Sequence, residues 1–132
     1  MTETEGEGPS LYERLGGAPG LSAYVDHFYQ IMSTDPAAGP IWAMHKRDLD
    51  DLKARLTAFL SGFVGGPVAY PQKYGAPMMR ARHLPFPIGL EARDLWLNCA
   101  YRAIAATFAD REAALQFARA LAGFADHMRN VS

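Results

Sequence analysis

Apolar side chains recur at steps of three and four residues in four separate stretches of the chain, around Leu21, Leu49, Leu90 and Phe117. These steps place the side chains on one side of an α-helix, which is how a helix covers a buried core. No segment alternates apolar and polar residues for long enough to predict a β-strand. The spacing therefore predicts an all-α fold, with four principal helices and shorter ones around one core.

Residues that start or stop helices divide the chain. Ser10 and Glu13 form a capping box that predicts a short helix from Leu11, which Gly16-Gly17 ends. Asp48 and Asp110 are expected to cap two later helices. Residues 1–9 are acidic and glycine-rich and predict a disordered tail, which leaves 10–132 as one domain. Residues 68–77 predict a loop of about ten residues, long enough for a functional role.

Composition and charge exclude several classes of protein. Apolar residues make up 49% and charged residues 20% of the 132, as in ordinary soluble domains. The net charge of −1 gives no field that would attract nucleic acid or an anionic membrane. No apolar run is long enough to span a bilayer, and the acidic start lacks an export signal, so we expect a cytoplasmic protein. Cys99 is the only cysteine, which excludes an internal disulfide and a cysteine-cluster metal site.

Motifs for common enzyme chemistries are missing. Gly16-Gly17 and Gly65-Gly66 indicate turns, because neither lies between a strand and a helix as a phosphate-binding loop would. Neither an HExxH motif nor a nucleophile elbow occurs. The sequence gives no support to hydrolytic catalysis.

The most informative stretch surrounds His83. Pro85 and Pro87 cannot continue a helix, so a short helix at 77–83 should end at or within a residue of His83. The side chains on either side are Arg80, Arg82, Leu84, Phe86 and Ile88. An imidazole among hydrocarbon with guanidinium groups near by suits an apolar ring with acidic edges, such as haem. A lone histidine of this kind is more often a hydrogen-bonded core residue, and spacing alone leaves both interpretations open.

Two buried hydrogen donors accompany this histidine. Tyr29 and Trp96 lie on the apolar stripes of their predicted helices, where an unpaired hydroxyl or indole N–H would cost about 1–3 kcal/mol. Taken singly, such groups usually bond to a nearby carbonyl. Together with His83 they could instead converge on one cavity.

Five pieces of sequence, in this order and spacing, carry a family resemblance. They are Leu11 to Gly17, Phe28-Tyr29, Phe59 to Pro67, Arg80 to Ile88, and Arg93 to Leu97. Double glycines are common, but the arginine–histidine–proline block followed by Trp96 is highly specific. Over residues 10–129 the chain resembles the truncated haemoglobins of group II. The resemblance implies a two-on-two helical sandwich around haem b.

The resemblance also assigns roles to residues. His83 matches the iron ligand, bound through Nε2, with the other ring nitrogen donating to a backbone carbonyl. Tyr29 and Trp96 match donors on the opposite, distal side, where hydrogen bonds stabilise charge on a bound ligand. At the corner that follows Tyr29's helix, counting along the chain allows Trp42 or His45. We favour His45 as a third distal donor, because it is polar.

Other matched positions form the expected haem contacts. The hydrophobic ones are Leu52, Leu56, Phe59, Leu84, Phe86, Ile88 and Trp96. Arg82, with Tyr70 and Lys73 from the long loop, matches positions that hold the haem propionates. Ala76 stands where many relatives carry histidine, and we assign no function to that difference.

The resemblance implies binding of O2, NO, CO or other small ligands. Several donors around the ligand predict slow oxygen release, which suits redox chemistry on the ligand better than transport. NO dioxygenation or peroxide reduction with an external reductase is therefore possible, and whether the protein is an enzyme stays open. The alternative is a haem-based sensor that acts through a partner protein. We expect a monomer or homodimer and neither nucleic acid nor membrane as a partner.

Overall fold

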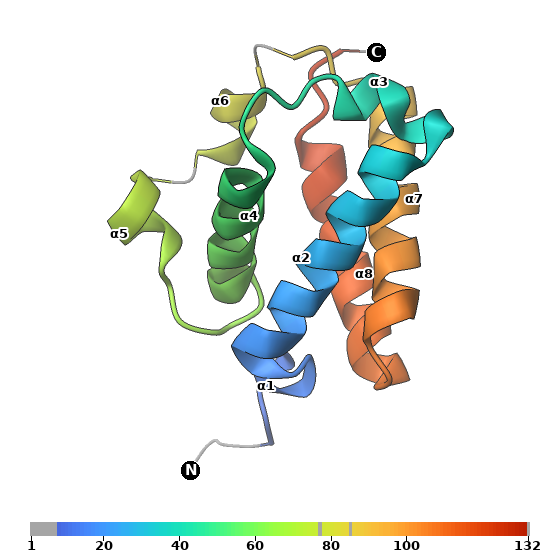
Figure 1. Ribbon diagram of the computed structural model, residues 1–132. Helices are drawn as coiled ribbons and strands as arrows, with labels where there is room; N and C mark the ends of the chain where they lie inside the picture. Colours follow the sequence, from blue (N-terminus) through green and yellow to red (C-terminus); the bar gives the residue numbers. More distant parts are fainter. Residues whose placement is uncertain (1–7, 77, 85, 132) are drawn as a thin grey trace.

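Helix α2 (Gly17–Thr34) is the central element of the fold. In the computed structural model, which describes residues 8–76, 78–84 and 86–131, it packs against both α4 (Leu49–Phe63) and α7 (Leu90–Thr107). Helix α7 in turn packs against α8 (Arg111–His127). The pairs α2–α4 and α7–α8 form a two-on-two arrangement (Figure 1).

Short helices connect these four. They are α1 (Leu11–Arg14), the 3-10 helix η1 (Pro36–Ala38), α3 (Gly39–Trp42), α5 (Tyr70–Tyr74) and α6 (Met79–His83). Figure 1 shows α5 and α6 beside α4, away from the α7–α8 pair. The described ranges contain helices and connections but no strand, so the prediction of an all-α fold is confirmed.

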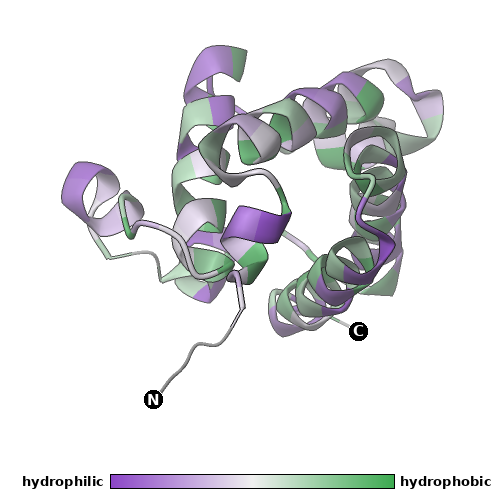
Figure 2. Ribbon diagram, turned by 90° about the horizontal axis from the view of Figure 1, so that it is seen from below, coloured by the Kyte–Doolittle hydropathy of each residue, from purple (hydrophilic) through white to green (hydrophobic). Residues whose placement is uncertain are grey.

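The core lies where α2 meets α7 and α8. Six side chains of α2 are buried: Leu21, Tyr24, Val25, Phe28, Tyr29 and Met32. The ring of Tyr24 lies 5.1 Å from that of Phe117 on α8 and 5.8 Å from that of Phe108, measured between centroids. Figure 2 shows both hydrophobic and hydrophilic residues along each of the long helices, as expected of amphipathic helices.

Most predicted helix ends are confirmed. Ser10 and Glu13 make the capping box, and the side chains of Asp48 and Asp110 accept hydrogen bonds from the first turns of α4 and α8. Helix α2 begins at Gly17 rather than at Leu21. Pro19 is accommodated there because an amide in the first turn needs no partner within the helix.

The prediction of a loop over 68–77 is wrong in part, because α5 lies within it. Pro71 fits in the first turn of α5, where its missing N–H costs nothing. Gly75 follows the helix at a φ of +83°, a conformation that glycine adopts without strain. His83 is the last residue of α6, as predicted from the prolines. Residue 77, Pro85 and residues 1–7 of the predicted tail lie outside the described residues.

No helix in the described part of the chain is both long enough and apolar enough to cross a membrane. Cys99 is a buried thiol on α7, and its burial raises the pKa of that group.

Candidate functional site

A cavity of about 590 Å³ opens between α4 and the rest of the fold. Its volume is in the range of sites that hold a cofactor or small molecule. Side chains from α4, α5, α6, α7, α8 and the connections around them line it. Most of the lining is apolar, and the charged side chains among it are Lys46, Arg47, Arg55, Arg82 and Arg93.

Helix α4 supplies one apolar wall. Leu52, Leu56 and Phe59 are three or four residues apart, which brings them to the same face of the helix. All three remain partly exposed, and Leu60 is the only residue of α4 that is buried. This face of α4 therefore borders the cavity, while the same side chains also pack against the edge of the core.

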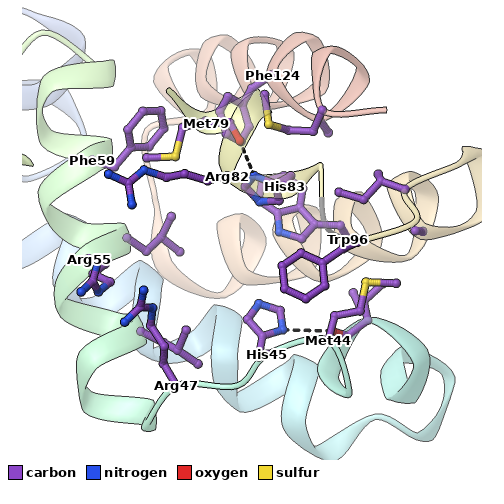
Figure 3. A pocket seen from close by; sticks show the side chains of 18 of the residues that line it. Met44, His45, Arg47, Arg55, Phe59, Met79, Arg82, His83, Trp96 and Phe124 are labelled. Carbon is purple, nitrogen blue, oxygen red and sulfur yellow. Dashed lines mark hydrogen bonds between the residues drawn. The ribbon is translucent and has the colours of Figure 1, made fainter. Parts of the chain in front are cut away.

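His83 enters the cavity from α6 (Figure 3). Its Nδ1 lies 2.6 Å from the carbonyl oxygen of Met79, one turn earlier in the same helix. A carbonyl oxygen can only accept, so this hydrogen bond places the ring proton on Nδ1. Nε2 is left with a lone pair, which is the form of imidazole that binds a metal ion.

His45 lies on the opposite side of the cavity from His83, in the connection between α3 and α4 (Figure 3). Its Nδ1 is 2.9 Å from the carbonyl oxygen of Ile41. Burial is the main cause that lowers the pKa of His45, with a smaller contribution from the nearby His83. A neutral ring with its proton on Nδ1 has an acceptor at Nε2, so the geometry favours an acceptor where the sequence analysis expected a donor.

Two aromatic residues lie behind His45. Trp42 stacks on the imidazole with ring centroids 5.6 Å apart, and the ring of Tyr29 meets its edge at 5.9 Å. His45 lines the cavity, whereas Trp42 and Tyr29 do not. Burial raises the pKa of Tyr29, so its hydroxyl keeps the proton that it can donate.

Trp96 lines the cavity directly from α7. Its ring is held by edge contact with Phe28 at 5.3 Å and by Phe124 at 6.2 Å. No acceptor bonds to the indole N–H within the described ranges, where Arg129 Nε is the only buried side-chain nitrogen or oxygen that has no partner. The indole N–H is therefore not sealed in packed protein and can serve a ligand in the cavity.

Arginines gather along the α4–α6 side of the cavity. Arg82 donates to the carbonyl oxygens of Tyr74 and Ala76, both at 3.0 Å, and so ties α6 to α5. Arg55 bonds to Asp51 at 2.9 Å and lies 4.4 Å from the centre of the Tyr74 ring. The hydrogen bond to Asp51 is the main cause that raises the pKa of Arg55.

Arg47 shares the same carboxylate of Asp51 at 3.6 Å. Two cations thus face one anion beside the cavity, and the local excess of positive charge suits an acidic group on a ligand.

Several predicted contacts line the cavity and two do not. Those that line it are Leu52, Leu56, Phe59, Tyr70, Arg82, Phe86, Ile88 and Trp96. Lys73 lies on the exposed side of α5, because Tyr70 and Tyr74 use the face that turns inward. Leu84 is 53% exposed after the end of α6. Neither of these two side chains lines the cavity.

The sequence analysis missed other lining residues. Phe124 and Met128 were visible as an apolar stripe on the last helix, but nothing in that stripe showed that its end faces a cavity. Arg55 and Arg47 lie four residues on either side of Asp51, a spacing that predicts ion pairs within a helix and not a ligand site. Met79 directly precedes the family block and carried no signal of its own.

Comparison with known proteins agrees with this fold over most of the chain. The model of the bacterial-like globin family matches residues 10–130. Group 2 truncated hemoglobin YjbI of Bacillus subtilis (strain 168) is 42% identical over 88 residues, which are 67% of this chain and 64% of that relative.

Solved structures agree closely. The group II 2-on-2 hemoglobin of the plant pathogen Agrobacterium tumefaciens has a TM-score of 0.90 and 36% identity, covering 98% of this chain and all of that one (100%). The cold-adapted truncated hemoglobin of the Antarctic marine bacterium Pseudoalteromonas haloplanktis TAC125 also has a TM-score of 0.90, with 35% identity over 94% of this chain and 100% of that one. The chain therefore belongs to the bacterial-like globins and, within them, to the group II truncated haemoglobins, a family that binds ligands through haem.

Proposed function

We propose that the protein holds haem b through His83 and binds dioxygen and other diatomic ligands on the side of His45 and Trp96. The observation that carries this proposal is that His83 lines an apolar cavity of about 590 Å³ while its Nδ1 is bonded to the Met79 carbonyl oxygen, which leaves Nε2 available to a metal ion. A core histidine of the ordinary kind would have both ring nitrogens paired with protein groups.

The residues present fit a haem. Leu52, Leu56 and Phe59 offer hydrocarbon to one part of a flat apolar ring, and Phe86 and Ile88 offer it from the connection after α6. Arg47, Arg55 and Arg82 provide cations for the two propionates of haem b, in the guanidinium geometry that pairs well with carboxylates. Charge, shape and a metal-binding imidazole therefore coincide at one site.

The chain's own residues then set the behaviour of a ligand. Haem supplies an iron atom that binds a diatomic gas and shares charge with it. Trp96 has an indole N–H at the cavity and can donate to that charge. The hydroxyl of Tyr29, whose ring lies edge-to-face with that of His45, is a second donor. His45 is neutral and offers an acceptor that can orient a nearby hydroxyl.

The test of haem ligation is absorbance of the protein reconstituted with haem. We expect an intense Soret band in the parental chain and a shifted or lost band in His83→Ala. His127→Ala, at the exposed end of α8, is the matched control and should give the parental spectrum. A parental chain without a Soret band, or an unchanged band in His83→Ala, would contradict the proposal.

The test of the distal donors is the rate of dioxygen release. Removing a hydrogen bond of ordinary strength should speed release about tenfold, and Trp96→Phe should have the larger effect because Trp96 lines the cavity directly. Tyr29→Phe should have a smaller effect, because that ring lies behind His45. If both variants release dioxygen at the parental rate, the account of the donors is wrong.

Slow release favours a reaction on the bound ligand over delivery of oxygen. NO dioxygenation or peroxide reduction with an external reductase is the chemistry that we infer for this site. Reaction of the oxygenated protein with NO, measured beside peroxide turnover, decides between the two. A sensor acting through a partner would show neither activity above that of haem alone, and would capture that partner in a manner that depends on oxygen.

A further inference from the structure

The end of the chain crosses over the connection that follows His83. The side-chain amide of Asn130 makes three hydrogen bonds to the main chain there. Its Oδ1 accepts from the Ile88 N–H at 2.8 Å. Its Nδ2 donates to the carbonyl oxygen of Phe86 at 2.9 Å and to that of His83 at 3.2 Å. One side chain thus holds both ends of the connection between α6 and α7.

Main-chain contacts strengthen this attachment. The N–H groups of Asn130 and Val131 both donate to the carbonyl oxygen of Ile88, at 2.8 and 3.2 Å. Arg80 of α6 donates to the carbonyl oxygen of Arg129 at 3.3 Å. Residues 129–131, which we call the C-terminal clasp, therefore bind α6 and the following connection at several points.

Only an amide can make the three bonds of Asn130. Two of its partners are carbonyl oxygens, which accept, and the third is an N–H group, which donates. The amide supplies two donors on nitrogen and an acceptor on oxygen, and this assignment fixes its orientation. Aspartate would keep the acceptor, lose both donors and set a negative charge against two carbonyl oxygens.

Helix α6 needs contacts from elsewhere in the chain to be stable. It has five residues, none of them buried, and so short a helix has little stability of its own. The ring of His83 is bonded to Met79 in that same helix, so the imidazole turns whenever the helix turns. Met78, which precedes the helix, has a φ of +40°, a costly conformation for a residue with a side chain.

We propose that Asn130 is a positioning residue for the haem-binding histidine. By holding the His83 carbonyl from the end of the chain, it fixes the direction in which Nε2 enters the cavity, and so tunes the bond between His83 and iron. This inference rests on the proposed function, because it concerns the same imidazole. It adds a residue that lies 47 positions away from His83 in sequence but next to it in the structure.

The test is the iron–histidine stretching band in the resonance Raman spectrum of the ferrous haem-loaded protein. In Asn130→Asp we expect this band to shift and broaden, and haem to transfer to apomyoglobin about tenfold faster, as is usual for loss of a partner that orients a metal ligand. Asn98→Asp, the same change at an exposed position of α7, should leave both readouts at the parental value.

Asn130→Ala provides a second variant, since it removes the side chain without adding a charge and keeps the main-chain bonds to Ile88. We expect the Raman band and the haem-loss rate to change in the same direction but by less. If circular dichroism shows that Asn130→Asp does not fold, Asn130→Ala takes its place as the test. An unchanged band and haem-loss rate in the folded Asn130 variants would overturn the inference while leaving the proposed function intact. A parental protein with no iron–histidine band would overturn the proposed function itself.

Discussion

The two sides of this fold are built differently. On one side, α2, α7 and α8 bury a continuous set of side chains against one another, including Tyr24, Phe28 and Phe117. On the other side, α4 buries only Leu60, and α6 buries none of its residues. The apolar residues of α4 are present in the same helical spacing, yet those that line the cavity stay partly exposed.

This difference separates two roles of hydrophobic residues. The packed side is stabilised by contacts within the protein, so its free energy of folding needs no other molecule. The cavity side has apolar area that protein contacts do not cover, and only a ligand of matching shape can remove that area from water. Each of the following changes acts on one side and not on the other.

The largest effect should come from removing a large buried side chain on the packed side. Phe117→Ala removes a ring that has no solvent exposure and touches Tyr24, and should cost about 3–5 kcal/mol of the unfolding free energy of the haem-free protein. Leu56→Ala, on the wall of the cavity, should cost less, roughly 1 kcal/mol, because Leu56 is already partly exposed and the side chain borders an existing cavity. Urea denaturation of both variants measures the two losses. Similar losses of unfolding free energy in the two variants would show that the two sides do not differ in how tightly they are packed.

A smaller effect should come from adding one methyl group to each side. A Cβ at Gly20 on α2 would lie 1.8 Å from the carbonyl oxygen of Leu15, so Gly20→Ala must displace main chain and should cost about 1–3 kcal/mol. At Gly62 on α4 the nearest atoms belong to Val68, at 3.6 Å and beyond. Gly62→Ala should therefore stabilise the helix by about 0.5–1 kcal/mol. Thermal unfolding should therefore give a lower melting temperature for Gly20→Ala and a higher one for Gly62→Ala. A melting temperature of Gly20→Ala equal to that of the parental protein would contradict the close approach of Gly20 to Leu15.

The smallest effect should come from lowering the pH, which protonates a carboxylate at the start of α8 on the packed side. The pKa of Asp110 is lowered first by the hydrogen bond from the Ala113 N–H and then by Arg14, whose guanidinium lies 3.1 Å away. A carboxylate with a lower pKa in the folded state stabilises the fold at neutral pH, and that contribution is lost as the pH falls below about 4. Asp110→Asn keeps a capping oxygen but not the charge, so its melting temperature should fall less between pH 7 and pH 3. An identical fall in both proteins would contradict this assignment.

Much of the packed side could be predicted from the sequence because its signals are local. The stripe from Leu21 to Met32 and the cap at Asp110 each lie within one helix, and the structure has them as expected. The cap at Asp48, on the cavity side, is a local signal of the same kind and is also present. The helix within residues 68–77 could not be predicted, because Pro71 and Gly75 are also the residues of a loop.

The site was less accessible to such reasoning. The prolines placed His83 at a helix end, and the family block suggested the role that we propose for it. The tautomer of His45 depends on the Ile41 carbonyl, a contact within one turn that no side-chain pattern reveals. The attachment of Asn130 to His83 joins residues far apart in the chain, and a lone asparagine near a terminus carries no signal of that kind.

Hydrogen exchange with and without haem tests the difference between the two sides most directly. On adding haem to the apoprotein, we expect the amides of α4, α5 and α6 to become strongly protected, while those buried in α2, α7 and α8 change little beyond the global gain in stability. The same experiment with His83→Ala should show a much weaker gain over α6. Protection already complete over α4–α6 in the apoprotein, or no gain there on adding haem, would contradict the account.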